Sequence, residues 1–327
     1  MIKLSTICIL ILIHSSLASY DAQFIKVGSG ADALAMGETS ADINPIFAPI
    51  YNDAIMGLQK GVGFGFTHIK GRIACDYLPS WFIDYWTFIL PIPKLKAHIG
   101  LSNLFFNTIV EENGALTPGN LIVETDNSIK ISFSKIIGEQ CFLGCGVKAI
   151  TPSLRYVTQY IGPNAFYAFD LSGIYEFKTF SIIASIQNVG GSVKYEGWFR
   201  NITGDTNAHY IKIDAPLPTE IRLGGGWARP LLHKEKISLC LDIRKGIGDN
   251  PYSSIYFTGI NLGGEIGISE KIFLRIGTIY EYFKNHLESR NTTCGIGAKI
   301  DFLKIDVGMC NTAAVNKFSL AICGGIQ

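Results

Sequence analysis

Apolar and polar residues alternate one by one along most of this chain, in segments of about ten residues. In 128–135, for example, Ile129, Ile131 and Phe133 alternate with serine and lysine residues. Successive side chains of a β-strand point to opposite faces, so a period of two predicts strands with one apolar and one polar face. The pattern predicts an all-β protein of about fourteen strands. The alternating segments are 62–67, 82–90, 95–102, 128–135, 141–149, 166–177, 181–188, 220–228, 236–244, 255–268, 272–282, 294–302 and 317–326.

The contents of the two faces favour a membrane barrel over a soluble β-sandwich. The polar face carries charged residues beside glycine and serine, whereas the apolar face carries aliphatic residues, with Trp227, Tyr280 and Tyr282 near strand ends. Outer-membrane barrels have a lipid-facing apolar band, aromatic girdles and a polar lumen. We therefore predict a transmembrane antiparallel β-barrel, with the sandwich as the alternative. The charges predicted to face the lumen are Asp170, Arg222, Asp242, Arg244, Arg275 and Glu281.

The composition agrees with a chain whose surroundings are partly lipid. Only 17% of the 327 residues are charged, 48% are hydrophobic and 35 are glycine, whereas about 25% are charged in soluble domains. The 28 basic and 27 acidic residues give a formal net charge of +1. The balance excludes a nucleic-acid-binding protein, which needs an excess of basic residues, and the apolar content excludes a disordered chain.

The first eighteen residues have the pattern of a signal peptide. Lys3 precedes the apolar run 4–13, and the segment ends in small residues at Ala18. The run is too short for a helix that spans a bilayer, which needs about 20 residues. Beyond residue 18, no apolar stretch reaches 18 residues. We therefore expect residues 1–18 to be an export signal and the mature chain to lie in a bacterial outer membrane.

Residues 19–58 interrupt the alternation. The stretch 24–58 is rich in glycine and alanine, and it carries Asn44, Asn52 and Asp53, whose side chains can hydrogen-bond irregular backbone. Irregular backbone that faced lipid would leave polar groups unpaired. We therefore expect 19–58 to be an N-terminal plug inside or across the mouth of a barrel formed by 59–327. A disordered tail is the alternative.

Several stretches resemble, in their order along the chain, motifs of the PorV/PorQ family of outer-membrane proteins. The first lies in the expected plug and comprises Met36 and Gly37, followed by Asn52, Asp53 and Ala54. Asp53 stands where the family motif has proline. The other matching stretches are 185–191, 216–224, 274–277 and 316–320.

This resemblance implies a barrel related to the long-chain fatty-acid transporter FadL, with about fourteen strands and an N-terminal plug. Some members of the family belong to the type IX secretion system, where they act on exported cargo at the cell surface. The resemblance therefore implies a secretion accessory, whose partners are secretion-system proteins or exported cargo. The alternative is a FadL-like transporter, whose partner is a hydrophobic small ligand. Both functions place outer-membrane lipid around the chain.

The search for catalytic chemistry is negative. The six histidines show no spacing typical of a zinc site, and no P-loop or Gly-x-Ser-x-Gly elbow occurs. The lumen charges allow an acid–base interpretation, but in a barrel such charges usually form ion pairs. We therefore expect no enzyme, no metal and no cofactor.

The stretch 189–218 is predicted to be a long outer loop. Its aromatic residues favour contact with a partner or ligand, because aromatic side chains contribute much of the energy of interfaces. Anchoring at the membrane surface is the alternative. The candidate contact residues are Tyr195, Trp198, Phe199 and Tyr210.

Overall fold

A computed structural model of the chain describes most of its residues. The predicted signal peptide, 1–18, lies outside the described part. The described residues are 25, 28, 30–41, 43–72, 80–111, 121–151, 153–156, 159–161, 165–200, 208–230, 235–247, 258–283, 286–311 and 315–323.

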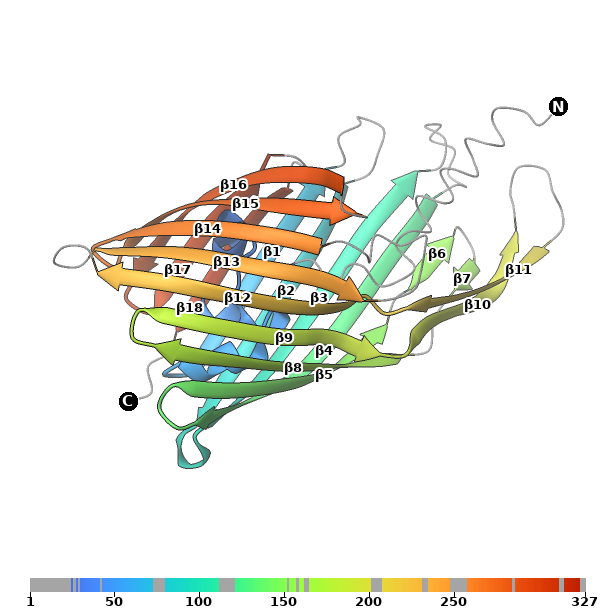
Figure 1. Ribbon diagram of the computed structural model, residues 1–327. Helices are drawn as coiled ribbons and strands as arrows, with labels where there is room; N and C mark the ends of the chain where they lie inside the picture. The colour runs from blue at the N-terminus through green and yellow to red at the C-terminus, as the bar shows by residue number, and fades with distance from the viewer. Residues whose placement is uncertain are drawn as a thin grey trace.

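Within this part of the chain, fourteen strands form a closed antiparallel ring (Figure 1). The strands pair with their neighbours around the ring, β1 pairs with β18, and β3 pairs with β4, so the hydrogen bonding is continuous. The all-β barrel of about fourteen strands is thereby confirmed. The ring consists of β1 (Gly63–Arg72), β2 (Ser80–Ile92), β3 (Ala97–Glu111), β4 (Leu121–Ile137), β5 (Cys141–Thr151), β8 (Phe166–Phe177), β9 (Phe180–Gly190), β12 (Thr219–Pro230), β13 (Lys236–Ile247), β14 (Thr258–Ile268), β15 (Ile272–Phe283), β16 (His286–Ile300), β17 (Leu303–Cys310) and β18 (Val315–Cys323).

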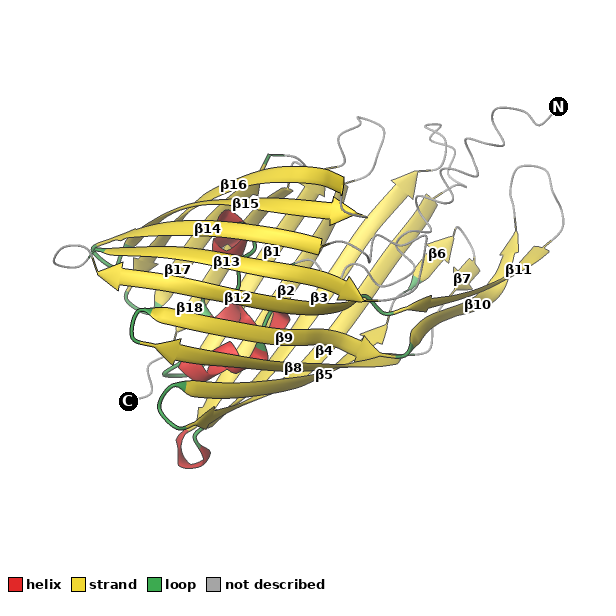
Figure 2. Cartoon of the chain, viewed as in Figure 1, coloured by secondary structure: helices red, strands yellow, loops and turns green. Residues whose placement is uncertain are grey.

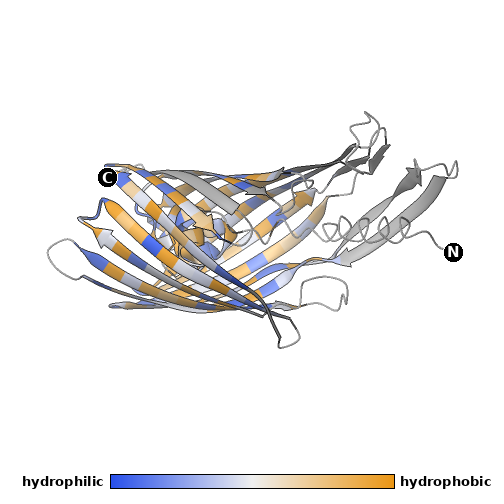
Figure 3. Cartoon of the chain, turned by 90° about the horizontal axis from the view of Figure 1, so that it is seen from above, coloured by the Kyte–Doolittle hydropathy of each residue, from blue (hydrophilic) through white to orange (hydrophobic). Residues whose placement is uncertain are grey.

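The strands turn their apolar faces outward and most of their polar faces inward. On β4, Ile129 and Ile131 are 46% and 61% exposed, whereas Lys130 and Ser132 are 3% and 1% exposed. The alternation of hydropathy along the strands is visible in Figure 3. This distribution is the reverse of that in a soluble protein, and it is the distribution expected of a barrel surrounded by lipid.

The two ends of the ring differ in their connections. At one end, which we call the short-turn end, turns of two to four residues join the strands at 93–96, 138–140, 178–179, 269–271 and 301–302. Gly138 has φ of +75°, in the left-handed region that glycine adopts without strain. At the opposite end, the long-connection end, the chain between β9 and β12 runs from 191 to 218.

Inside the ring lies the N-terminal segment, by which we mean the described residues 30–41 and 43–59 (Figure 2). It contains α2 (Ala31–Ala35) and the 3₁₀ helices η2 (Pro45–Ile50) and η3 (Asp53–Leu58). Ile46 and Phe47 of η2 are fully buried. Among the described residues, no helix has the length and apolar character needed to cross a membrane.

The structure corrects the prediction that 189–218 is a loop without strands. This stretch contains an antiparallel hairpin of β10 (Ser192–Arg200) and β11 (Ala208–Pro216), which projects from the long-connection end (Figure 1). Aromatic and β-branched residues favour strands, and both arms are rich in them. The register places Tyr195 opposite Ile213, Trp198 opposite Tyr210 and Phe199 opposite His209.

Candidate functional site

The candidate site is the region of the lumen where the N-terminal segment contacts the inward-facing side chains of the ring. Asn52 fixes the start of η3, because its side chain accepts a hydrogen bond of 3.0 Å from the Ala54 amide. Its Nδ2 also donates to the carbonyl oxygens of Gly173 on β8 and Ala184 on β9, at 3.2 and 3.3 Å. A Cβ atom at Gly144 on β5 would lie only 2.8 Å from the Ala54 Cα. A glycine in the wall therefore allows the close approach of η3.

Asp53 belongs to a buried group of four charges, the Lys130 cluster: Asp53, Lys130, Asp170 and Lys148. Lys130 Nζ lies 2.8 Å from Asp53 Oδ1 and 2.5 Å from Asp170 Oδ2, and Lys148 Nζ lies 2.9 Å from Asp170 Oδ2. All four side chains are at most 5% exposed. Two lysines and two aspartates balance one another, and buried charges need such pairing. The segment supplies one of the two anions, so it completes the charge balance of the wall.

Hydrogen bonds extend the Lys130 cluster. Ser132 Oγ donates to Asp53 Oδ1 at 2.6 Å, and Lys130 Nζ donates to the carbonyl oxygen of Pro49 at 2.5 Å. Burial raises the pKa of Asp53 above its usual value, with Asp170 acting in the same direction and Lys130 in the opposite one. Lys130 is therefore the main group that favours the ionised form of Asp53.

A second contact joins the middle of the segment to β12 and β13. The Ser40 amide and hydroxyl both donate to Asp242 Oδ2, at 2.7 and 2.6 Å. Arg222 Nη1 lies 3.6 Å from the same oxygen and donates to the Glu38 carbonyl at 3.1 Å. The Arg222 guanidinium also lies over the Tyr51 ring, 5.2 Å from its centroid. One arginine thus holds two turns of the segment.

A third contact holds α2. Asp32 Oδ2 lies 3.1 Å from Lys304 Nζ, which is 3.6 Å from Asp306. Arg275 pairs with both Asp306 and Glu265, at 2.6 Å in each case. Burial raises the pKa of Asp32, but the positive charges of Lys304 and Arg275 together bring this pKa below its usual value. The Asp32 carboxylate is therefore the ionised partner of a charged network in the wall.

Met36 and Gly37 lie directly on the backbone of the wall. Gly37 has φ of +69°, and its amide donates to Thr293 Oγ1 at 3.0 Å. A Cβ atom at Gly263 on β14 would lie 2.8 Å from the Met36 Cβ, and one at Gly277 on β15 would overlap the Gly37 backbone. Two inward-facing glycines therefore form the surface on which this turn rests.

The sequence prediction and the structure overlap in part. The structure places Met36, Gly37, Asn52, Asp53 and Ala54 against the wall, and it brings the segment into contact with the clusters that contain Asp170, Arg222, Asp242 and Arg275. Arg244 pairs with Glu281 at 3.5 Å and lies 4.0 Å from Glu220, the partner of Arg222. Of the predicted outer contact residues, the backbones of Tyr195, Trp198, Phe199 and Tyr210 lie in β10 and β11.

Sequence reasoning missed Lys130, Lys148, Lys304 and Asp306 as contact residues. Lys130 stands on the polar face of 128–135, and Lys130 and Lys148 are direct neighbours across β4 and β5. Two like charges side by side require an anion nearby. Two lysines on the polar faces of adjacent strands could therefore have indicated a buried site that binds an anionic side chain.

Toward the long-connection end, part of the lumen is apolar. Tyr85 on β2 faces Phe47 of η2, with ring centroids 6.5 Å apart. The cavities beside Ile50 have volumes of about 20 and 10 Å³, room for about one water molecule each. We call this group the inner apolar cluster: Ile25, Ile46, Phe47, Ile69, Ile83, Tyr85, Leu104, Ile150, Ala168 and Leu217.

The charged groups of the lumen form ion pairs with one another and with the N-terminal segment. Among the described residues, no group of three or more histidine, cysteine, aspartate or glutamate residues is arranged to hold a metal ion.

Comparison with solved structures identifies the fold. The toluene transporter TbuX of Ralstonia pickettii matches with a TM-score of 0.62 at 15% sequence identity, over 90% of this chain and 96% of that one. The toluene transporter TodX of P. putida matches with a TM-score of 0.61 at 14% identity, over 92% and 99% of the two chains. A Pseudomonas aeruginosa FadL homologue matches with a TM-score of 0.58 at 9% identity, over 90% and 95%.

The chain has the fold of the FadL-type channels. The match covers nearly the full length of each neighbour, so the likeness extends over the whole architecture. No family profile matches the sequence. No curated protein matches it significantly.

Proposed function

We propose that this protein is an outer-membrane channel for hydrophobic small molecules, with residues 19–58 as its plug. Two of its structural neighbours are toluene transporters. The apolar outer face of the ring supports a location in lipid, and the buried ion pairs around the N-terminal segment support a plug that is seated in the lumen.

The inner apolar cluster is the observation that carries this proposal. A channel for ions or sugars is lined by polar groups. Here inward positions of the adjacent strands β1, β2 and β3 carry Ile69, Ile83 and Leu104, each at most 4% exposed. Sites for small hydrophobic ligands are mostly apolar, with a few polar groups that fix orientation. Because the cavities beside Ile50 have room for only about one water molecule each, passage of a larger molecule requires the segment to shift.

The uptake of radiolabelled toluene by cells that carry the protein tests the proposal. We expect Leu104→Thr to lower uptake at low toluene concentration by roughly tenfold, because a polar group then lines an apolar passage. Leu101→Thr on the same strand is the matched control, since Leu101 is 39% exposed on the outer face whereas Leu104 is 4% exposed. Equal uptake by the two variants at equal protein levels would contradict the proposed route.

The membrane location has its own test on β13. Leu241 lies at the middle of this strand and is 44% exposed, so Leu241→Arg places a charge at the bilayer midplane. We expect a loss of about 2–4 kcal/mol in the free energy of unfolding, measured by urea refolding into lipid vesicles. Ile247→Arg, at the last residue of the same strand, should cost only about 0–1 kcal/mol near the interface. Equal costs at both depths would argue against a membrane-spanning strand.

The second candidate function is that of the PorV/PorQ resemblance, a secretion accessory that binds secretion-system proteins or exported cargo. The β10–β11 hairpin favours it, because the paired strands project beyond the ring, where a partner can reach them. Two results together would favour this function over transport. Toluene uptake would be unchanged by Leu104→Thr, and removal of the hairpin would cause the loss of an exported protein from the medium.

A further inference from the structure

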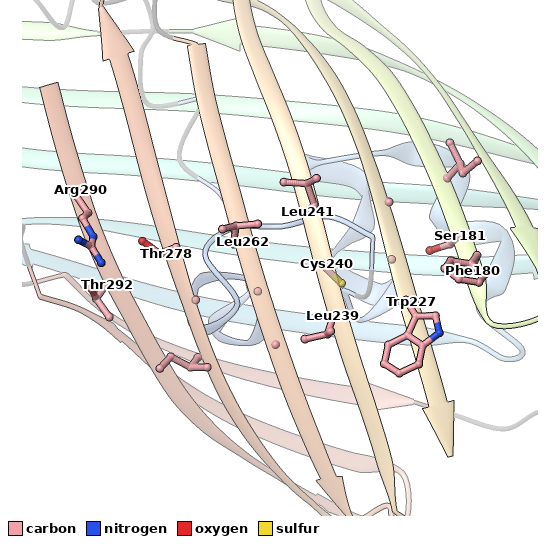
Figure 4. A pocket seen from close by; sticks show the side chains of 17 residues that line it. Phe180, Ser181, Trp227, Leu239, Cys240, Leu241, Leu262, Thr278, Arg290 and Thr292 are labelled. Atoms are coloured by element: carbon pink, nitrogen blue, oxygen red, sulfur yellow. The ribbon is translucent and has the colours of Figure 1, made fainter. Parts of the chain in front are cut away.

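The outer face of the ring carries a broad hollow across β9, β12, β13, β14, β15 and β16. Its volume is about 910 Å³, within the size range of ligand pockets. Leu239, Leu241, Leu262 and Ile276 line it and are 40–63% exposed. Figure 4 shows these leucines between Trp227 on one side and Arg290 on the other. The hollow therefore opens to the surroundings of the barrel and not to the lumen.

Outward-facing glycines form part of the floor of the hollow. At Gly264, the nearest atom to an added Cβ is Leu239 Cδ2, at 3.5 Å, and at Gly225 it is a backbone oxygen at 3.4 Å. Both positions therefore have room for a side chain on the outside. Gly263, which precedes Gly264 in β14, faces inward and contacts Met36. Gly277, opposite Gly263 on β15, contacts Met36 and Gly37. At this place the wall is one backbone thick, with the N-terminal segment on one side and the hollow on the other.

A basic residue stands at one border of this apolar surface. Arg290 is exposed, and its guanidinium lies 5.6 Å from the centroid of the Tyr280 ring on the neighbouring strand. Both residues lie toward the long-connection end of β15 and β16. Tyrosine and tryptophan residues near strand ends form the girdles of a membrane barrel, at the depth of lipid headgroups, and Tyr280 lies three residues before the end of β15. An outward arginine is tolerated at that depth, where it can meet an anionic headgroup.

We propose that the hollow binds an acyl chain of an anionic membrane lipid whose headgroup pairs with Arg290. The apolar floor and leucine sides match the acyl chain, and the arginine matches the negative charge. The proposal rests on the membrane location of the proposed function, and it is independent of transport. It also places the lipid chain across the wall from Met36 and Gly37, so an occupied hollow supports the strands on which the segment rests.

Photo-cross-linking tests the proposal with the full chain in phosphatidylcholine bilayers that contain a trace of acyl-diazirine phosphatidylglycerol or acyl-diazirine phosphatidylcholine. Cross-linked peptides are identified by mass spectrometry. We expect the anionic probe to label peptides from 223–241 and 260–278 about fivefold more strongly than the zwitterionic probe. One basic residue strengthens the binding of an anionic lipid by about this factor. Arg290→Gln should remove this preference, and Gly264→Leu should reduce labelling by both probes.

Two control variants separate the hollow from ordinary lipid contact. Gly173 on β8 faces outward with its nearest Cβ neighbour at 3.5 Å, as Gly264 does, but it lies outside the hollow, so Gly173→Leu should leave labelling unchanged. Lys135→Gln removes an exposed basic residue of β4, outside the hollow, and should leave the preference unchanged. Equal labelling by both probes in all variants would overturn the proposal, and so would a dimer mass with protein cross-links from these peptides. Lack of toluene uptake would leave these results intact, because they do not depend on transport.

Discussion

Deletion of residues 24–58 is expected to convert the closed barrel into an open pore. In a planar bilayer, the full chain should show no resolved conductance steps, whereas the deletion variant should show discrete open-channel steps. Barrels of eight strands are filled by their own side chains, and those of sixteen or more leave an aqueous channel. A fourteen-stranded ring falls between these sizes, and here the fully buried residues Ile46, Phe47, Ala48 and Met56 occupy its lumen.

Removal of the hairpin is the matched control for this deletion. The Leu217 amide donates to the Gly191 carbonyl, so a short turn can replace residues 192–216 and rejoin β9 to β12. This deletion takes away chain that projects beyond the ring, and it should leave the conductance unchanged. Both variants should keep the heat-dependent shift in gel mobility that marks a folded barrel. An inserted 24–58 deletion variant without conductance would show that the segment is not what closes the lumen.

The strands of this fold were predictable because alternation acts locally. The side chains of 128–135 and 236–244 alternate without interruption, so the face of Lys130 or Asp242 follows from its position alone. The inward position of both residues in the structure agrees with that rule. The closure of the ring was predictable as well, since an apolar exterior on every strand leaves no place for an open edge in lipid.

The pairing between the segment and the wall was not predictable. Alternation assigns a face to Lys130, but it says nothing about which residue of the N-terminal segment lies opposite. Asp53 meets Lys130 because the ring brings β4 and β8 to one side of the lumen, while Asp32 meets Lys304 on the other side of it. Such contacts depend on the stagger of the strands around the barrel, which no single segment encodes.

The hairpin was missed for a different reason. The stretch 189–218 contains Gly190, Gly191, Pro216 and Pro218, which are typical of loops and turns. In the structure, these residues lie at the base of the hairpin, where the chain leaves β9 and enters β12. The turn residues therefore mark the ends of a strand pair, and the aromatic residues between them form its arms.

Replacement of Lys130, the cation that pairs with Asp53 of the N-terminal segment, is expected to destabilise the folded barrel strongly. Lys130→Met leaves Asp53 without its cation, while Asp170 keeps Lys148 at 2.9 Å. Loss of one partner from a buried ion pair costs about 3–5 kcal/mol. Urea refolding into lipid vesicles should show a loss of this size in the free energy of unfolding. Lys135→Met on the same strand is the control, since Lys135 is exposed and its loss should change stability by less than about 0.5 kcal/mol.

The pH dependence of this loss distinguishes an unpaired charge from a packing defect. Burial already raises the pKa of Asp53, and removal of Lys130 takes away the main influence in the opposite direction. With a raised pKa, the folded variant takes up a proton at a higher pH than the unfolded chain does, so its stability should increase as the pH is lowered through that raised pKa. The double variant Lys130→Met, Asp53→Asn should recover part of the loss at about pH 8 and show little further gain at low pH. A loss that is independent of pH and is not relieved by Asp53→Asn would mean that Lys130 acts through packing, and that the charge of Asp53 does not hold the segment in the lumen.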